Sequence, residues 1–269
     1  MMKKILFLLF LMSNLMFGQT ELLNNNTATQ IDSTLWQGVR NRIKDQTFFI
    51  KINPTGENYF KRAKLKGEIE DYNGAISDLD LALKLSPNEL AIYYTRGGYK
   101  ERINDLNGAL EDFTKIIISK PSFEWGWHDR ALINIKLKKY ENAEKDLIKA
   151  LELKPNWGMA IFAQGLMYDK KKEYEKSILY YTKSLEINPE NYLAFNNIGF
   201  INFMLKKYDL AIYNYSKAID LNLKYFNAYR NRADARIAKK DFSGACQDLN
   251  IASGLGDLKA KEYYKEYCK

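Results

Sequence analysis

The stretch LAIYYTRGGYKERINDLNGALEDFTKIIISKP, residues 90–121, sets the pattern for most of the chain because similar stretches recur on both sides of it. All five prolines of the sequence follow this recurrence, with spacings of 33, 34, 34 and 34 residues: Pro54, Pro87, Pro121, Pro155 and Pro189. A fixed period of this length is typical of a repeat array, in which each unit contacts mainly its neighbours. The sequence therefore predicts an extended array, whose length follows from the number of units.

Six units align between residues 56 and 257 when the positions of each unit are numbered from 1 to 34. They begin at Gly56, Leu90, Glu124, Gly158, Tyr192 and Phe226. Positions 8, 20 and 27 hold alanine, glycine or serine at every site except Ile116, whereas large residues recur at positions 4 and 24. Small residues let two helices cross closely, and large residues fill the space beside them. Because a short polar turn separates two apolar-periodic segments, each unit is predicted to be helix–turn–helix.

These units resemble the tetratricopeptide repeat over about three quarters of the chain, from residue 56 to residue 257. The resemblance implies an all-α fold, a right-handed superhelical solenoid whose first helices line a concave groove, and a protein or peptide as the partner. Unit 4 departs from the usual pattern at Gln164, Ser177 and Ser184. Units 5 and 6 end in Leu223 and Asp257, where proline is usual.

Residues 1–19 have the composition of a secretory signal peptide. Lys3 and Lys4 precede an apolar run, residues 5–17, that is well short of the roughly 20 residues a membrane span needs. An N-terminal membrane anchor is the alternative. We expect the mature protein to be exported from a bacterium and to be periplasmic, envelope-associated or secreted.

Both ends of the array are predicted to carry capping segments. Residues 20–55 begin as a polar linker and continue in a more apolar stretch, residues 35–52, that we interpret as an N-terminal capping helix. Residues 258–269 are predicted to form a C-terminal capping helix, because Tyr267 is too large for the close crossing that a further helix would require.

The two cysteines, Cys246 and Cys268, are predicted to form a disulfide. Cys246 begins the last second helix and Cys268 ends the antiparallel capping helix, which brings these two ends together. Export to an oxidising compartment would allow such a bond to persist.

Arginine and aspartate recur together at positions 7 and 23 of four units: Arg62 with Asp78, Arg96 with Asp112, Arg130 with Asp146, and Arg232 with Asp248. Units 4 and 5 lack both partners. Because the two residue types are present or absent together, we predict an ion pair between the two helices of each of the four units. Four independent surface charges are the alternative, and these would contribute little to stability.

No catalytic motif is visible in the sequence. It lacks a Gly-rich phosphate loop, GxSxG, HExxH and CxxC, and the single histidine has no cysteine or serine in its own stretch. We therefore predict a protein that is not an enzyme and needs no cofactor or metal. The net charge of +8 is too modest to indicate nucleic acid as a partner.

The resemblance places position 5 of each first helix in the groove. This position holds four ring-bearing residues followed by two polar ones: Phe60, Tyr94, His128, Phe162, Asn196 and Arg230. Phe200 at position 9 extends the apolar lining, and nearby amides can bind an extended peptide backbone. The predicted groove residues are Phe60, Tyr94, His128, Phe162, Asn197, Phe200, Asn227, Arg230 and Asn231. Packing between helices is the alternative role for the rings.

The turns of units 3 to 6 are rich in lysine. We call this set the lysine ridge: Lys136, Lys138, Lys139, Lys170, Lys171, Lys172, Lys206, Lys207, Lys239 and Lys240. Most such residues are simply solvated. The preferred function is a scaffold that holds a protein or peptide in the groove. Two alternatives remain: a membrane-surface adaptor that uses the lysine ridge on anionic lipid, and a glycan-binding envelope protein that uses the position-5 rings.

Overall fold

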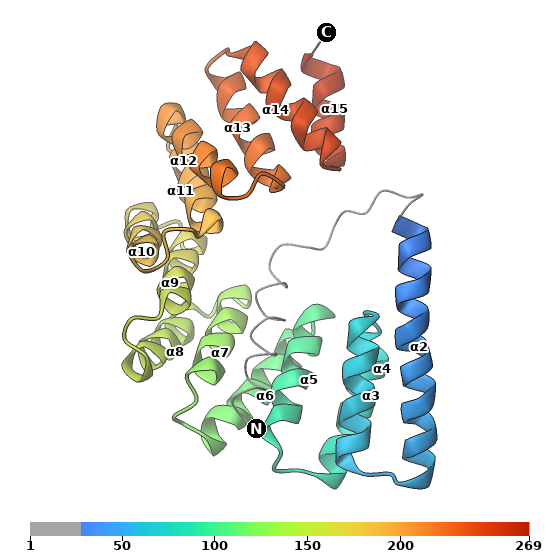
Figure 1. Ribbon diagram of the computed structural model, residues 1–269. Helices are drawn as coiled ribbons and strands as arrows, with labels where there is room; N and C mark the ends of the chain where they lie inside the picture. The colour runs from blue at the N-terminus through green and yellow to red at the C-terminus, as the bar shows by residue number, and fades with distance from the viewer. Residues whose placement is uncertain (1–27, 269) are drawn as a thin grey trace.

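The computed structural model describes residues 28–268, with side chains from residue 36, as fourteen α-helices without a strand among them (Figure 1). The predicted signal peptide, residues 1–19, and the first part of the predicted linker lie outside the described residues. The predicted all-α fold is confirmed.

Twelve of the helices form six pairs in chain order. The first helices are α3 (Gly56–Glu68), α5 (Leu90–Arg102), α7 (Glu124–Lys136), α9 (Gly158–Lys170), α11 (Tyr192–Met204) and α13 (Phe226–Ala238). The second helices are α4 (Tyr72–Leu85), α6 (Leu106–Ser119), α8 (Tyr140–Leu153), α10 (Tyr174–Ile187), α12 (Tyr208–Leu221) and α14 (Phe242–Gly254). Each first helix begins at the residue with which its unit begins in the sequence alignment.

A residue in the left-handed backbone region closes the turn of every unit at position 15. Its φ lies between 58° and 65° in the six units, although none of these residues is glycine. The N–H group of position 16 donates to the C=O group of position 11, as Asp71 does to Lys66 at 2.9 Å and Lys139 to Asn134 at 2.8 Å. This satisfies carbonyl groups at the end of the first helix and reverses the chain.

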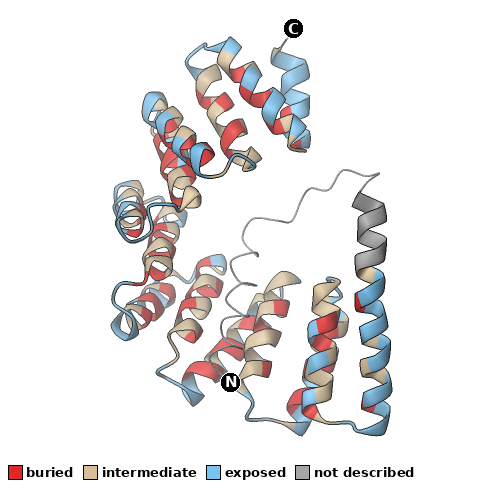
Figure 2. Cartoon of the chain, in the orientation of Figure 1, coloured by how far each residue is buried: buried red, intermediate tan, exposed pale blue. Residues whose placement is uncertain are grey.

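The core lies where the two helices of a unit cross and where consecutive units meet (Figure 2). Positions 8, 20, 24 and 27 are buried in all six units. The residue pairs at positions 8 and 24 are matched in size. Units with leucine at position 24 have alanine at position 8, whereas Tyr181 and Tyr215 lie against Gly165 and Gly199. A Cβ atom on Gly165 would lie 2.6 Å from Tyr181 Cδ1, which explains why glycine is needed there.

The pairs stack into a curved array (Figure 1). From α7 to α10 the first helix of each pair lies on the inside of the curve and the second on the outside. First helices also contact one another, α7 with α9 and α11 with α13, whereas no second helices in the described part of the chain make a comparable contact. Closer spacing on the inside than on the outside gives the array its curvature.

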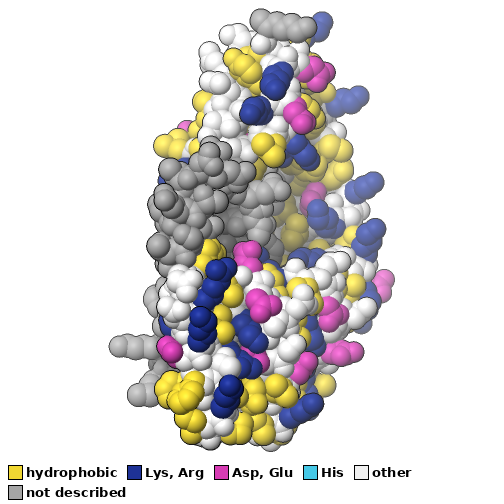
Figure 3. All heavy atoms as spheres, turned by 90° about the vertical axis from the view of Figure 1, so that its right-hand side faces the viewer, with side chains coloured by type: hydrophobic (Ala, Val, Ile, Leu, Met, Phe, Trp, Pro, Cys, Tyr) yellow, Lys and Arg dark blue, Asp and Glu magenta, His cyan; other side chains and the backbone are white. Residues whose placement is uncertain are grey.

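Helix α2 (Ala28–Ile52) covers the N-terminal end of the array and includes the predicted capping stretch. It packs on α3 through the buried Val39 and Ile50, and its Thr47 Oγ1 accepts a hydrogen bond from Arg62 at 3.2 Å. Figure 3 shows the side of the molecule that carries α2, and hydrophobic side chains gather at the lower end of this side. Phe48 and Phe49 are exposed near the end of this helix.

Helix α15 (Leu258–Tyr267) packs on α14 and ends the array. The predicted disulfide is confirmed: Cys246 and Cys268 are bonded, with their Cα atoms 5.6 Å apart. Asp257, which stands where proline is usual, caps α15 by accepting from the N–H groups of Lys259 and Ala260. Within residues 28–268, no helix combines the length and the apolar character that crossing a membrane requires.

Candidate partner-binding face

The four predicted arginine–aspartate pairs are present and fix each first helix against its partner. In every pair the arginine donates from Nε and Nη2 to the two carboxylate oxygens, at distances from 2.5 to 3.0 Å. The four aspartate side chains are at most 3% exposed. This two-point geometry leaves little freedom for the first helix to rotate.

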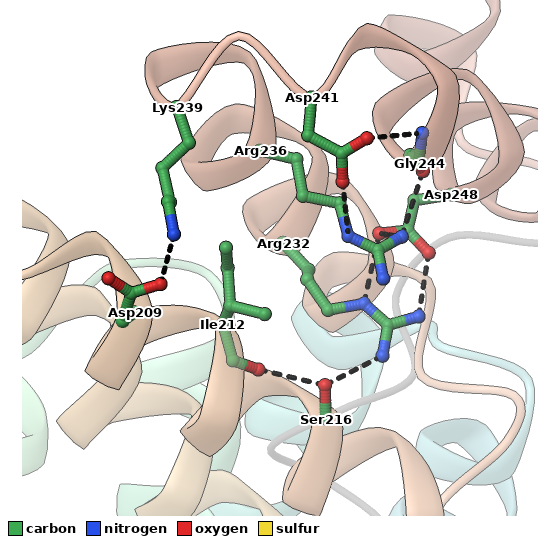
Figure 4. A network of polar contacts seen from close by, with 9 residues as sticks. All are labelled: Asp209, Ile212, Ser216, Arg232, Arg236, Lys239, Asp241, Gly244 and Asp248. Carbon is green, nitrogen blue, oxygen red and sulfur yellow. Dashed lines mark hydrogen bonds and ion pairs between the residues drawn. The ribbon is translucent and has the colours of Figure 1, made fainter.

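The same arginines also join neighbouring units, which the sequence analysis did not predict. Their Nη1 atom reaches the preceding second helix: Arg96 to Asp80 at 2.6 Å, Arg130 to Thr114 at 3.3 Å, and Arg232 to Ser216 at 2.8 Å (Figure 4). Position 11 adds a further donor to each buried carboxylate, such as Arg236 to Asp248 at 2.8 Å. The first helices of units 1, 2, 3 and 6 are therefore held in a fixed orientation, whereas units 4 and 5 lack these arginines.

We call the side of the first helices that faces the inside of the curve the inner face. In units 2 and 3, the predicted groove residues make contacts within the protein. Tyr94 Oη donates to Asp129 Oδ2 at 2.6 Å, and His128 Nδ1 lies 2.8 Å from Asp129 Oδ1. Burial and the neighbouring carboxylate hold the pKa of Tyr94 well above its ordinary value. His128 is only 4% exposed.

Two tryptophans missed by the sequence analysis account for the burial of His128. The ring centroids of Trp157 and His128 are 4.8 Å apart. The ring of Trp125 contacts both, with centroid distances of 5.9 Å to His128 and 4.7 Å to Trp157. The expectation that His128 faces an open channel is therefore wrong, because its ring packs against these tryptophans. Trp157 comes from the loop before α9, and position-5 spacing gives no sign of it.

The ring-bearing residues of units 1, 4 and 5 differ in exposure. Phe60 and Phe162 are half-buried and pack on core clusters. The ring centroids of Phe162 and Tyr181 are 5.1 Å apart. Phe200 is 43% exposed. Of the predicted groove rings, Phe200 therefore has the largest exposed fraction.

The predicted amides and Arg230 bind one another and the end of the array. Asn231 Nδ2 donates to Asn196 Oδ1 at 3.0 Å, and Asn197 Nδ2 donates to Tyr181 Oη at 3.1 Å. Arg230 donates to Asp257 at 2.6 Å and to Asn227 Oδ1 at 2.9 Å. The idea that these groups are free to hold a peptide backbone needs correction, since each already has an internal partner.

Two partly buried carboxylates on first helices were also missed. Burial raises the pKa of Asp169 at position 12 of unit 4, although Lys170 lowers it from a distance of 3.9 Å. Burial likewise raises the pKa of Asp234 at position 9 of unit 6, against the opposing effect of Arg230. Within the described residues no group of three or more histidine, cysteine, aspartate or glutamate side chains is placed to hold a metal.

Comparison with known proteins identifies the repeat. Residues 56–89, 126–156 and 159–191 match the family described as tetratricopeptide repeat, in the register of units 1, 3 and 4. A solved tetratricopeptide repeat protein from Parabacteroides merdae superposes with a TM-score of 0.74 and 18% identity, covering 90% of this chain and 97% of that chain. The chain is a tetratricopeptide-repeat (TPR) protein.

Other solved structures share the TPR solenoid at low sequence identity, and the predicted right-handed superhelix is thereby confirmed. Cut9 in the Cut9–Hcn1 hetero-tetramer matches with a TM-score of 0.67 and 13% identity, covering 88% of this chain and 48% of that chain. Yeast Tom70 matches with a TM-score of 0.66 and 17% identity, covering 81% of this chain and 48% of that chain. No curated protein sequence matches the chain.

The lysine ridge follows the turns between the two helices of units 3 to 6. Some of its members are neutralised locally: Lys136 pairs with Glu101 at 2.7 Å, Lys171 with Glu173 at 2.7 Å, and Lys239 with Asp209. Lys138, Lys139, Lys172, Lys206, Lys207 and Lys240 are exposed, and none has a carboxylate within ion-pair distance in the described part of the chain. The ridge therefore divides into neutralised and uncompensated sites.

Proposed function

We propose that this TPR protein is an exported, non-enzymatic scaffold that binds a protein or peptide segment across the inner face of units 4 and 5. The observation that carries the proposal is Phe200, which is 43% exposed on the first helix α11 and is the most exposed of the predicted groove rings. A large aromatic side chain in this setting is a suitable anchor for an apolar side chain of a partner.

Other side chains on the first helices of units 4 to 6 indicate the chemistry of the partner. Phe162 and Phe203 on the two first helices are half-buried and add apolar surface. Asp169 and Asp234 are carboxylates that burial has partly deprived of water. A cationic side chain brought close to either would stabilise its charged form. A segment that combines apolar and basic residues therefore fits this face best.

Binding of protein partners is also consistent with the fold. TPR proteins generally bind other proteins, and the structural neighbour Cut9 is found in a hetero-tetramer with Hcn1. The glycan alternative has less support, because Tyr94 and His128 are engaged in internal contacts and present no ring platform.

Export rests on the sequence of residues 1–19 and is supported by the disulfide. A Cys246–Cys268 bond persists in oxidising compartments such as the bacterial periplasm or the extracellular space. The bond thus supports the proposal that the protein is periplasmic, envelope-associated or secreted.

Affinity capture with variants tests the proposal. The parent, Phe200→Ala and the control Leu179→Ala are used as baits in envelope extract, and captured proteins are quantified by mass spectrometry. Leu179 is 50% exposed on the second helix α10, so it matches Phe200 in exposure but lies on a different helix layer. The partner is expected to decrease at least about tenfold with Phe200→Ala and to remain with Leu179→Ala. Equal capture by all three baits would contradict the inner-face site.

A further inference from the structure

The turns of units 5 and 6 combine exposed apolar side chains with lysines that have no ion-pair partner. Met204 and Leu210 flank the turn of unit 5 and are 50% and 51% exposed, and Phe242 follows the turn of unit 6 and is 49% exposed. Exposed lysines lie between them in the sequence. We call this set the edge patch: Met204, Lys206, Lys207, Leu210, Lys240 and Phe242.

The two turns that carry the edge patch are adjacent in space. Lys239, in the turn of unit 6, forms an ion pair with Asp209 at the start of α12 (Figure 4). Asp209 stands between Lys207 and Leu210 in the sequence, and Lys239 precedes Lys240. This contact joins the two turns, so the six residues belong to one edge of the array.

The positive charge of the edge patch is uncompensated. Lys171 and Lys239 in the same ridge each lie beside a carboxylate. Lys206, Lys207 and Lys240 form no ion pair among the residues that the structure describes, and the nearby Asp209 and Asp241 pair with Lys239 and Arg236. A net positive edge attracts anionic groups over about 8 Å at physiological salt.

The exposed apolar side chains favour one class of anionic partner, a membrane surface, over nucleic acids and acidic proteins. Lysines alone suffice to attract a nucleic acid or an acidic protein, but neither requires methionine, leucine and phenylalanine to be exposed among them. At a bilayer surface, apolar side chains enter the boundary between headgroups and acyl chains while lysines contact the phosphates. We infer that the edge patch docks the protein on an anionic membrane surface. Docking of this kind needs no membrane-spanning helix.

Vesicle co-sedimentation with the purified chain, residues 20–269, tests this inference. The vesicles contain phosphatidylcholine either alone or mixed with phosphatidylglycerol. The parent protein should bind the mixed vesicles and should not bind vesicles of phosphatidylcholine alone. The triple variant Lys206→Gln, Lys207→Gln, Lys240→Gln should bind the mixed vesicles at least about tenfold more weakly.

A matched control has the same change of charge elsewhere. Lys84, Lys115 and Lys145 are exposed on second helices of units 1 to 3 and have no ion pair in the described chain. The variant Lys84→Gln, Lys115→Gln, Lys145→Gln should bind like the parent. Equal loss in both triple variants would overturn the inference, because attraction by net charge alone would then explain the binding.

A third variant tests the apolar contribution. Replacing Met204, Leu210 and Phe242 by serine should weaken vesicle binding while the circular dichroism spectrum and melting midpoint stay near those of the parent. Unchanged vesicle binding by this variant, or equally tight binding of the parent to single-stranded DNA, would overturn the membrane assignment in favour of a general polyanion site. Failure of the parent to bind mixed vesicles would overturn it directly.

Discussion

The guanidinium of Arg130 donates to both carboxylate oxygens of Asp146, at 3.0 Å from Nε and 2.6 Å from Nη2, and so joins the two helices of unit 3. Asp146 is 2% exposed and also accepts from Asn134 at 3.0 Å. A buried carboxylate that loses its principal cation remains desolvated, so removing one partner costs more than removing both.

A double-mutant cycle on Arg130→Ala and Asp146→Ala should therefore show strong coupling. We expect an interaction free energy of about 1–3 kcal/mol from urea unfolding. The exposed pair Lys149 and Glu152, 2.8 Å apart on the surface of α8, is the control and should couple weakly. Additive effects of the Arg130 and Asp146 changes would show that the pair does not join the helices.

The contact between Gly165 and Tyr181 predicts a size rule for position 8. Gly165→Ala would place a Cβ atom 2.6 Å from the tyrosine ring and should destabilise the protein by about 1–3 kcal/mol. Adding Tyr181→Leu should recover part of this loss, because unit 3 pairs Ala131 with Leu147. Gly98→Ala is the control: no atom lies within 4 Å of its Cβ position, so this change should stabilise the helix. A destabilising Gly98→Ala would contradict the steric explanation.

The raised pKa of Asp169 predicts a pH-dependent stability. Burial favours the protonated carboxyl, so its folded-state pKa lies above the ordinary value of 3.8. The stability associated with this group is fully present below the unfolded-state pKa and is lost as the pH rises through the folded-state pKa. Asp169→Asn should therefore raise the melting midpoint at pH 7, and the difference from the parent should shrink as the pH is lowered toward 3.8. A lower midpoint at pH 7 would show that the charged form is needed for stability.

The Cys246–Cys268 bond fixes α15 to α14 across a sequence separation of 22 residues. Closing a loop of this length contributes about 3 kcal/mol in the chain-entropy model. We expect thiol labelling of the unfolded protein to find no free thiol before reduction and two afterwards. The Cys246→Ser, Cys268→Ser variant should lose amide-exchange protection first in α15. Two free thiols in unreduced protein would contradict the bond.

The sequence predicted what the repeat makes equivalent from unit to unit. Arg130 and Asp146 were recognisable as a pair because the same residues recur together in three other units, and Gly165 was recognisable as a close-crossing site for the same reason. Contacts specific to one place were not predictable. His128 is buried by Trp157, from the loop before α9, and Arg230 binds Asp257, which stands where proline is usual. The residue at position 5 therefore differs in burial and in contacts between units, even though its spacing is constant.

Phe200 alone is the suitable residue for a variant that tests the inner-face site. Truncating Phe162 and Phe200 together would remove the contact of Phe162 with Tyr181 as well as the binding surface, and so would confuse loss of stability with loss of binding. Phe200 alone reduces this ambiguity, because it is 43% exposed and has no aromatic contact of this kind among the described residues.

The central claim is that a protein or peptide partner lies on the inner face of units 4 and 5, and site-specific photo-crosslinking in the native envelope measures this most directly. A photoreactive amino acid is placed at position 200 in one variant and at position 179 in another, since both sites are exposed and lie on different helix layers. The account predicts that position 200 gives a discrete crosslinked product, whose partner peptide contains apolar and basic residues, and that position 179 does not. The same product from position 179, with none from position 200, would contradict it.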